Sequence, residues 1–400
     1  MRIGMILDKS FPPDPRVENE ARVLLDDGHE VFLFCLDYDG YPAAEEIDGL
    51  QVRRYGSSSL EYRMSALAYT LPVYSWMLRP RIERFLRDYD IQALHVHDML
   101  VAQAALEANR SLDLPMVLDL HENRPEIMTL YPHLQRFPAK YMVSIKRWKS
   151  KEESLVRIFD RTVVVTEQAA ADLVERAGVG EERIIVVPNT VKDDFHDAAV
   201  IDATVVERFR EKFVLLYLGD TGLRRGLLTA IEGLRILSES IPEVELVIVG
   251  SNSTDQVLKD KVIELNLQDR VSFEGWKEES TFPSYLTAAD LCISPLHRNR
   301  HHDTTLANKL FQYMAFSRAI VASDATAQEN IIKRASCGLV HRERDARDFA
   351  AKCLDLYRDA DRRRSFGQNG QRFLHSEFNL KKIGGPLRDY YRYLDRPERA

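Results

Sequence analysis

The chain has 400 residues, and its composition, 45% hydrophobic and 29% charged, excludes an intrinsically disordered protein. A formal net charge of −7 argues against a protein whose main partner is a nucleic-acid backbone. No apolar run reaches the roughly 18 residues of a membrane span, and the four cysteines form no C-x-x-C pair. We therefore expect a cytoplasmic protein in a reducing compartment, with two domains for this length.

The first half of the chain alternates apolar runs with helical patterns, which is typical of an α/β domain. The run 2–8 predicts a buried strand, and a proline-rich loop at 12–15 precedes a helix that ends at Gly28. Further strands are predicted at 31–36, 51–55, 93–96, 116–120, 162–165 and 184–187. Strand–helix–strand units of this length favour a parallel sheet with right-handed crossovers.

The second half repeats this alternation after a stretch without a strand pattern that ends near residue 209. Strands are predicted at 213–218, 245–249, 271–274, 291–294, 319–322 and 338–340. We expect an N-terminal domain over 1–195, a C-terminal domain over 210–378, and a helix in 379–400 that could pack back on the N-terminal domain. Both domains would be doubly wound, Rossmann-like parallel sheets that face each other across a cleft.

The loop 219–226, with the sequence GDTGLRRG, follows one of these strands and leads into a helix that starts near Leu227. Glycines allow close approach of an anion, a helix N-terminus offers unpaired N–H groups, and two arginines can bind phosphate oxygens. The loop favours a diphosphate site, although its spacing is not the dinucleotide pattern G-x-G-x-x-G. A tight turn with solvated arginines would explain the same residues.

The segment 297–308 is a second polar loop, which meets a helix N-terminus near Ala307 where amides could bind an oxyanion. Its histidines, His297, His301 and His302, suggest metal binding as an alternative. Adjacent histidines point in different directions, and no cysteine or second spaced carboxylate joins them. We therefore predict that these histidines are solvated loop residues.

Two histidine-containing segments close strands of the first half, namely HVHD at 95–98 and DLHENRPE at 119–126. Strand alternation places His95 and His97 on one face, at the edge where α/β sheets bind ligands. An imidazole there could bond a sugar hydroxyl or transfer a proton. We predict that His95 is satisfied within the sheet and that His121, in a polar turn, is the stronger functional candidate.

Several runs carry a more specific pattern: FPPDPRV at 11–17, GHEV at 28–31, DLHE at 119–122, NKLFQYM at 308–314 and AIVAS at 319–323. Together they resemble the GT-B glycosyltransferases of family 4, which are retaining and depend on a nucleotide sugar. DLHE is similar to the family's Asp-x-His-[Asp/Glu] segment, and the last two runs are similar to its signature P-x-K-x-x-E-Y-M-x-x-x-x-P-V-V-A-S. The resemblance runs over nearly the whole chain. It implies transfer of a sugar from a UDP- or GDP-sugar to a glycan or lipid-linked acceptor, in cell-envelope or exopolysaccharide synthesis.

The resemblance also assigns roles to residues of both halves. In the C-terminal half it places the donor diphosphate at Gly222, Arg224, Arg225, Leu306, Ala307 and Asn308. It places the donor sugar at Asp303, Thr304 and Thr305, and the ribose and base at Gln312, Phe273, Gly275 and Trp276. In the N-terminal half, His121 would be the catalytic residue that faces the transferred sugar. The acceptor side would include Arg16, His97, Asp98 and Glu122.

The chain departs from the family pattern at its acidic pair. The two acids, with seven residues between them, fall on Thr304 and Gln312, so both carboxylates are missing. Asp303 could replace the first acid after a one-residue shift, and Arg224 could replace a basic residue where this chain has Asp220. The departure keeps a second function open, a non-catalytic partner that binds a nucleotide sugar. A sugar-nucleotide epimerase is disfavoured, because it would need acid/base carboxylates.

We expect no metal cofactor, since arginines and helix N-termini can stabilise a leaving diphosphate by themselves. No protein nucleophile is expected, because the resemblance implies front-face attack assisted by the departing phosphate. Two basic, aromatic segments, 60–86 and 140–151 around Trp148, could lie on an anionic membrane and give a peripheral contact at its inner face. Ordinary helices with solvated charges over an apolar face are the alternative.

Overall fold

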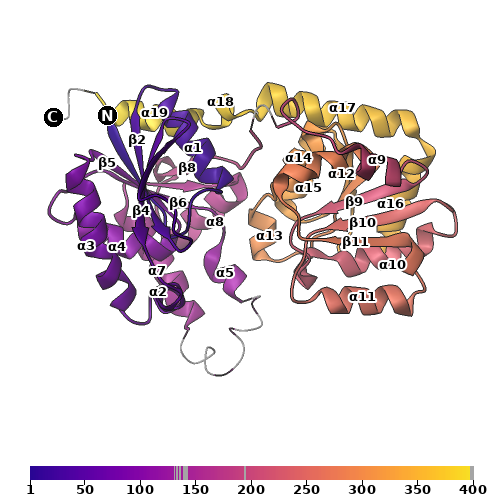
Figure 1. Ribbon diagram of the computed structural model, residues 1–400, viewed down its shortest axis with the longest axis horizontal. Coiled ribbons are helices and arrows are strands. Elements are labelled where there is room, and N and C mark those ends of the chain that lie inside the picture. The colour runs from indigo at the N-terminus through magenta and orange to yellow at the C-terminus, as the bar shows by residue number, and fades with distance from the viewer. Residues whose placement is uncertain (130, 132–133, 135–136, 138–142, 193–194, 397–400) are drawn as a thin grey trace. The chain divides into compact units, whose positions relative to one another are not determined.

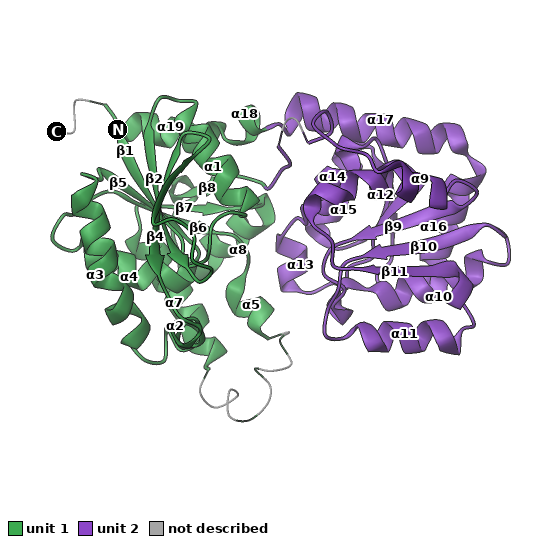
Figure 2. Cartoon of the chain, in the orientation of Figure 1, with its two compact units in different colours: residues 1–188, 380–400 green, residues 189–379 purple. Residues whose placement is uncertain are grey.

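Two parallel sheets organise the chain, one in each of two units (Figures 1 and 2). The computed structural model describes residues 1–129, 131, 134, 137, 143–192 and 195–396. Unit 1 comprises residues 1–188 and 380–400, and unit 2 comprises residues 189–379. The stretch expected to link the domains up to residue 209 thus lies in unit 2, where α9 (Ala203–Arg208) packs on α12 (Phe282–Ala288).

Unit 1 has an eight-stranded sheet in the order β3-β4-β2-β1-β5-β6-β7-β8. The strands are β1 (Arg2–Ile6), β2 (Glu30–Asp37), β3 (Ala44–Ile47), β4 (Leu50–Gly56), β5 (Ala93–His97), β6 (Met116–Leu120), β7 (Arg161–Val164) and β8 (Ile184–Val186). All pairs are parallel except β3 with β4. The sequence did not predict β3, a short edge strand of sequence AEEI with no apolar alternation.

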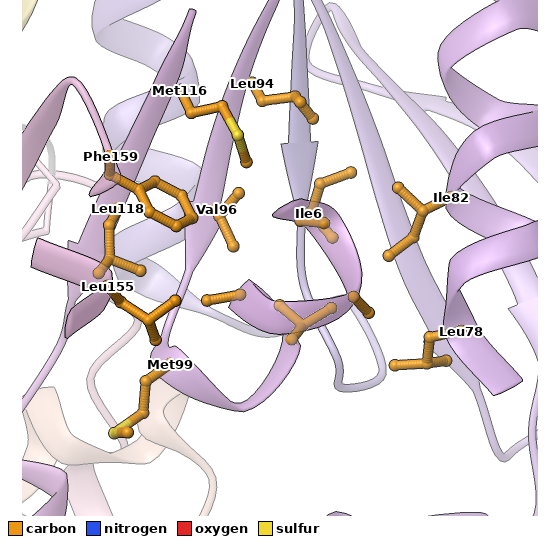
Figure 3. Packing of buried hydrophobic residues seen from close by; sticks show 14 of the residues in the cluster. Ile6, Leu78, Ile82, Leu94, Val96, Met99, Met116, Leu118, Leu155 and Phe159 are labelled. Carbon is orange, nitrogen blue, oxygen red and sulfur yellow. The ribbon is translucent and has the colours of Figure 1, made fainter. Parts of the chain in front are cut away.

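The helices of unit 1 cover both faces of this sheet. They are α1 (Pro15–Leu25), α2 (Ser59–Ser65), α3 (Val73–Asp88), α4 (Met99–Asn109), α5 (Arg124–Met128), α7 (Ile145–Ile158), α8 (Glu167–Ala177), α18 (Leu380–Ile383) and α19 (Gly385–Leu394). Figure 3 shows one core, in which strand residues such as Ile6, Val96 and Leu118 meet Ile82 of α3 and Leu155 of α7. The alternate strand residues belong to a second core with α1 and α19.

This alternation explains where the histidines of β5 point. Leu94 and Val96 lie in the core of α3, α4 and α7, whereas Ala93 lies in the core of α1 and α19. Because strand side chains alternate, His95 and His97 point to the same side as Ala93. Helix α1, on the same side of the sheet, begins at Pro15, because the side chain of Asp14 accepts hydrogen bonds from the N–H groups of Arg16 and Val17.

Unit 2 has a six-stranded parallel sheet in the order β11-β10-β9-β12-β13-β14. Its strands are β9 (Phe213–Leu218), β10 (Val244–Val249), β11 (Val271–Gly275), β12 (Leu291–Ser294), β13 (Ala319–Ser323) and β14 (Gly338–His341). Counted from β9, this is the Rossmann order 3-2-1-4-5-6, with its topological switch point between β9 and β12. The predicted fold class of two parallel-sheet α/β domains is confirmed.

The helices of unit 2 also lie on both sides of its sheet (Figure 1). Besides α9 and α12 they are α10 (Leu227–Leu237), α11 (Asp255–Glu264), α13 (Arg300–Thr304), α14 (Lys309–Ala315), α15 (Thr326–Ala335), α16 (Ala346–Arg358) and α17 (Ala360–Glu377). One core unites α10, α11 and α16 with the strands. Among the described residues of both units, no helix combines the length and apolar character that crossing a membrane requires.

Candidate functional site

The turn from β9 into α10 depends on one glycine. Gly226 has a φ of +75°, and a Cβ added to it would lie 1.7 Å from the carbonyl oxygen of Pro295. The missing side chain lets the 3-10 helix η3 (Leu223–Arg225) pass beside Pro295 and continue directly into α10. The helix predicted to start near Leu227 begins at that residue. Any side chain at position 226 would push the arginine-bearing turn away from its place.

Arg224 and Arg225 share one carboxylate. Asp220 Oδ2 lies 2.9 Å from Arg224 Nη2 and 3.1 Å from Arg225 Nε. Asn252 Nδ2 and the N–H of Gly222 donate to Asp220 Oδ1 at 2.6 and 3.2 Å. Burial raises the pKa of Asp220, but the two arginines outweigh it and hold this pKa below its ordinary value. The arginine side chains are only 19% exposed, so they are not solvated, and one negative charge holds two positive ones.

Two of the three histidines of the second loop, His301 and His302, are buried, which corrects the expectation of solvated residues, whereas His297 is half-buried. His301 and His302 lie in α13 and are 5% and 1% exposed. The helix is capped by Asn299, which accepts from the N–H of His302 at 2.9 Å, and His302 Nδ1 lies 2.7 Å from the carbonyl oxygen of His297. Burial lowers the pKa of His301 to about 3 and that of His302 to about 4. Both rings are therefore neutral near neutral pH.

Lys309 is a buried residue that falls on the lysine of the signature but received no assigned role from the sequence. It is the first residue of α14 and 7% exposed, and its Nζ lies 3.5 Å from the centroid of the Tyr217 ring. Its Nζ has no hydrogen-bond partner among the described residues, and the same holds for Arg224 Nε, His301 Nδ1 and His302 Nε2. Buried polar groups are normally paired. Unpaired nitrogens around a net positive loop therefore mark a site for an anion.

The residues assigned to the donor sugar already have hydrogen-bond partners within unit 2. Asp303 Oδ1 accepts from the N–H of Thr326 at 2.8 Å and from Arg298 Nε at 3.2 Å. Thr304 is buried, and the hydroxyl groups of Thr304 and Thr305 donate to carbonyl oxygens of α13. The Asp303 carboxylate is thus engaged in fastening α13 to α15, which argues against its replacing the missing family acid.

The turn before α14 holds the remaining residues assigned to the diphosphate. Leu306 is buried, Ala307 is half-buried and Asn308 is exposed. Asn308 precedes α14 without a side-chain hydrogen bond that would cap the helix. This is the arrangement expected where a ligand, rather than a side chain, approaches the first amides of a helix.

Gln312 is buried and paired with a carboxylate that the sequence did not single out. Its Nε2 donates to Glu279 Oε1 at 2.7 Å, from the 3-10 helix η5 (Glu279–Thr281). The neighbouring candidates for the base lie at the end of β11 and just beyond it. Phe273 is half-buried, Gly275 has a φ of +69°, and Trp276 is 71% exposed and offers an aromatic face to solvent.

In unit 1, Asp119 lies at the centre of the histidine cluster. Its Oδ2 lies 2.8 Å from His121 Nε2 and 3.1 Å from His97 Nδ1. Arg16 bonds the same carboxylate through Nε at 2.8 Å and through Nη2 at 2.5 Å. Burial raises the pKa of Asp119, but Arg16 and then His121 outweigh it and hold this pKa well below its ordinary value. Asp119 is therefore a fully buried, permanent anion.

The two histidines that contact Asp119 have pKa values shifted in opposite directions. Burial lowers the pKa of His121, but the Asp119 charge outweighs it and raises the pKa above its ordinary value. Burial dominates at His97 and lowers its pKa. The His121 side chain is 14% exposed, whereas those of His95 and His97 are fully buried. Of these three histidines, His121 is the one that can meet a ligand and carry charge.

The residues assigned to the acceptor side lie mostly inside unit 1. Arg16 is 8% exposed, and its three guanidinium nitrogens bond Asp119, Glu20 and the carbonyl oxygen of Val187. Asp98 is also buried, with a φ of +67° and an ion pair to Arg124 at 3.0 Å. Glu122 is more open, 29% exposed at its side chain. Arg16 and His97 both contact Asp119, and Asp119 in turn contacts His121.

One group of side chains in unit 1 has the composition of a metal site. Glu20, His95, His97 and Asp119 each offer a ligand atom, and these atoms lie within 4.8 Å of one another. Arg16 Nη2 already lies 2.9 Å from Glu20 and 2.5 Å from Asp119. A guanidinium thus supplies the positive charge between the two carboxylates, and it would repel a second cation. The group is thus a cluster of buried charges around Arg16, and Tyr391 of α19 adds a contact of 3.1 Å from its hydroxyl to His95 Nδ1.

Comparisons with known proteins agree with the two-unit architecture. Two family models match, glycosyl transferases group 1 at residues 202–373 and glycosyltransferase family 4 at residues 16–195. The α-D-kanosaminyltransferase of Streptomyces kanamyceticus is 23% identical, over 80% of this chain and 81% of that protein. The phosphatidyl-myo-inositol mannosyltransferase of Mycolicibacterium smegmatis is 22% identical, over 94% and 89%. Anabaena HepE, solved in complex with UDP, has the same fold with a TM-score of 0.72 at 14% identity, over 98% of this chain and 100% of that chain. The chain belongs to the family 4 glycosyltransferases of the GT-B type, and it is a transferase enzyme.

Proposed function

We propose that this glycosyltransferase takes its sugar from a nucleotide-diphosphate donor, a UDP- or GDP-sugar. The observation that carries the proposal is the loop of unit 2, where Arg224 and Arg225 outnumber Asp220 and buried nitrogens lack partners. A diphosphate supplies the missing negative charge and the missing acceptors together. HepE, which has a similar fold, binds UDP, and this supports the same ligand class here.

We propose that the same groups lower the barrier of the reaction. When the bond between the sugar and the diphosphate breaks, negative charge grows on the leaving phosphate. Arg224 and Arg225 are held by Asp220 before any ligand arrives, so their alignment costs little at the moment of reaction. We propose that this fixed positive charge takes the place of a metal ion, and that no protein nucleophile acts in a retaining, front-face transfer.

His121 is the proposed catalytic residue of unit 1. Its ring is fixed by Asp119 at 2.8 Å and its side chain is partly open to solvent. The Asp119 charge favours the imidazolium form, which can donate a hydrogen bond to a sugar oxygen. Arg16 keeps Asp119 ionised and thereby supports His121 without touching the substrate.

A thermal-shift panel of UDP, GDP, ADP and their sugars tests the donor proposal, because a ligand that binds the native state stabilises it. One base should raise the melting temperature by several degrees, and Arg225→Ala should weaken that binding about 10- to 100-fold, the effect of losing a charged hydrogen bond. Arg210→Ala is the matched control, since Arg210 is an arginine of unit 2 that is 73% exposed. Full binding by the Arg225 variant would remove this arginine from the site.

The replaced acidic pair supports a second candidate, a non-catalytic protein that binds a nucleotide sugar. Thr304 and Gln312 stand where the family has two carboxylates, and Thr304 is engaged with carbonyl oxygens of α13. An assay that uses chromatography to monitor release of the sugar from the stabilising donor distinguishes the active transferase from the non-catalytic protein. Tight binding without transfer to any acceptor or hydrolysis would favour the second candidate.

We further propose a glycan or lipid-linked acceptor, in cell-envelope or exopolysaccharide synthesis, presented at the inner face of a membrane. Helices α2 and α3 expose Leu60, Tyr62 and Trp76, 68%, 64% and 62% exposed, beside the exposed Arg63 and Arg79. Such an apolar and basic surface suits an anionic lipid surface. In the second basic segment, however, Trp148 is 2% exposed and packs edge-on against Tyr69, so it belongs to the core, and residues 140–142 lie outside the described part of the chain.

Vesicle co-sedimentation tests this surface. The protein should bind phosphatidylglycerol vesicles more tightly than phosphatidylcholine vesicles, and Leu60→Ser with Trp76→Ser should abolish the difference. Ile263→Ser is the control, because Ile263 is 56% exposed on α11 of unit 2. Equal binding by the double variant and the control would assign these residues to an ordinary surface.

A further inference from the structure

We propose that Lys309 binds the donor diphosphate directly and takes up a proton from solvent as the diphosphate binds. The inference rests on the proposed donor, and it adds a ligand group and a pH dependence to that site. Lys309 stands at the lysine of the signature P-x-K-x-x-E-Y-M, but the signature by itself does not show what that side chain does.

The position of Lys309 places a buried amine without a hydrogen-bond acceptor beside the loop that carries Arg224 and Arg225. Its stem enters the core as the first residue of α14, and its amine lies over the Tyr217 ring of β9. On another side is Gly219, where an added Cβ would lie 3.5 Å from Nζ, an ordinary contact distance. Gly219, which directly follows β9, thus brings no side chain and no hydrogen-bond acceptor of its own side chain to the amine. A phosphate oxygen would give Nζ the hydrogen-bond acceptor that it lacks.

The groups facing Lys309 leave it without a counter-charge of its own. They are Tyr217 of β9, Asp220 and Arg225 of the loop, and His302 of α13. Asp220 is the anion among them, and it already contacts Arg224 and Arg225. Burial, followed by the repulsion of Arg225, holds the pKa of Lys309 well below its ordinary value. The charged form of the amine is therefore disfavoured in the empty site.

Binding of a diphosphate reverses this balance. The new negative charges favour the ammonium, so the amine takes a proton from solvent, no covalent bond changes, and the ammonium donates to a phosphate oxygen. By linkage, affinity must then fall as pH rises from the pKa of Lys309 in the empty protein to its higher value in the complex. A lysine that only fills space in the core would give no proton uptake and no such dependence.

Calorimetry with UDP, or with GDP if UDP does not bind, measures the uptake in the unaltered protein. At about pH 8 the nucleotide itself is fully ionised, because the second pKa of a phosphate is about 6. Titrations in two buffers of different ionisation enthalpy should differ by the heat of transferring up to about one proton per bound nucleotide. Equal heats in the two buffers would overturn the proposal.

Two variants assign the proton to Lys309. Lys309→Met keeps the length of the side chain, removes the amine and should weaken binding about 10- to 100-fold, with the uptake lost. Lys309→Arg, which stays charged, should retain more affinity than the Met variant and also lose the uptake. Lys333→Met is the matched control, since Lys333 lies on α15 with its side chain 67% exposed. Unchanged uptake in the Met variant would exclude Lys309 as the acceptor of the proton.

The same data separate this inference from the donor proposal. If UDP and GDP bind, Arg225→Ala weakens them and Lys309→Met does not, the donor site stands and the role of Lys309 fails. If neither nucleotide binds the unaltered protein, both fail. Far-ultraviolet circular dichroism and the melting temperature show whether each variant is folded, and the buffer comparison on the unaltered protein requires no variant.

Discussion

At the scale of single residues, the pair Gln312 and Glu279 bears on the missing family acids. A glutamine cannot offer the charged acceptor that a ribose hydroxyl would meet in other members of the family. Gln312 Nε2 is bonded to Glu279 Oε1 at 2.7 Å, and Glu279 belongs to the exposed helix η5. The pairing places the Glu279 carboxylate next to Gln312, the residue that stands where the family has an acid. Because the Gln312 amide donates through its nitrogen, its oxygen can still accept a hydrogen bond.

We predict that Glu279→Ala weakens binding of UDP, or of whichever nucleoside diphosphate binds, by about tenfold, the loss of one charge-assisted bond. Binding of inorganic pyrophosphate should not change, because the pyrophosphate carries no ribose. Calorimetric titration of both ligands measures the difference, with the adjacent, exposed Glu278 replaced by Ala as control. An equal loss for pyrophosphate would place Glu279 in the charge balance of the whole loop instead.

At the scale of elements, the turn from η3 into α10 should tolerate no side chain. We predict that Gly226→Ala lowers the stability of unit 2 and abolishes nucleotide binding, because the added Cβ would overlap the carbonyl oxygen of Pro295. Gly275→Ala provides the comparison for stability. Gly275 also has a positive φ, +69°, but no atom lies within 4 Å of its added Cβ, so it incurs backbone strain of about 1–3 kcal/mol without the overlap. Urea unfolding of both variants measures the difference, and equal losses would mean that φ alone matters.

The elements also show what a sequence can predict. Long runs such as 213–218 and 319–322 are apolar at every position, so the buried strands β9 and β13 could be predicted within a residue. Strand β3 could not, because three exposed residues and a half-buried Ile47 at a sheet edge carry no pattern. The loops after β6 and β9 were located by their polar residues following apolar runs, since ligands of α/β sheets gather at the carboxyl ends of strands.

The state of the side chains in those loops could not be predicted. His301 and His302 look like loop residues in sequence and are buried by packing between α13 and its neighbours. Arg16 and His97 lie 81 residues apart in the chain, and the sequence does not show that both bond Asp119. Lys309 matches the lysine of the family signature, but its burial beside Tyr217, Asp220 and Arg225 shows only in the structure. The burial of these side chains and their hydrogen-bond partners depend on segments that are distant in sequence. The spacing of residues along the chain therefore does not predict them.

At the scale of the whole molecule, the chain begins and ends in unit 1. Leu387 and Tyr391 of α19 lie in the same buried cluster as Ile3 and Met5 of β1, so both ends of the chain build one core. Unit 2 has its own cluster around α10 and α16. Each unit therefore has what an independently cooperative domain needs, a sheet with a core of its own.

We predict that hydrogen exchange in increasing urea resolves two unfolding transitions, one for each unit. The stabilising nucleotide should raise only the transition of unit 2, by about 2.7 kcal/mol at a hundred times its dissociation constant, because its proposed ligands all lie in residues 189–379. Tyr391→Phe should lower only the transition of unit 1, by about 1–3 kcal/mol, because it removes the hydroxyl that lies 3.1 Å from the buried His95 Nδ1. Tyr62→Phe, at a side chain 64% exposed, should leave both unchanged. Equal shifts of both transitions by the nucleotide would contradict the prediction and show that the two units unfold together. The shift would then not assign the donor site to unit 2.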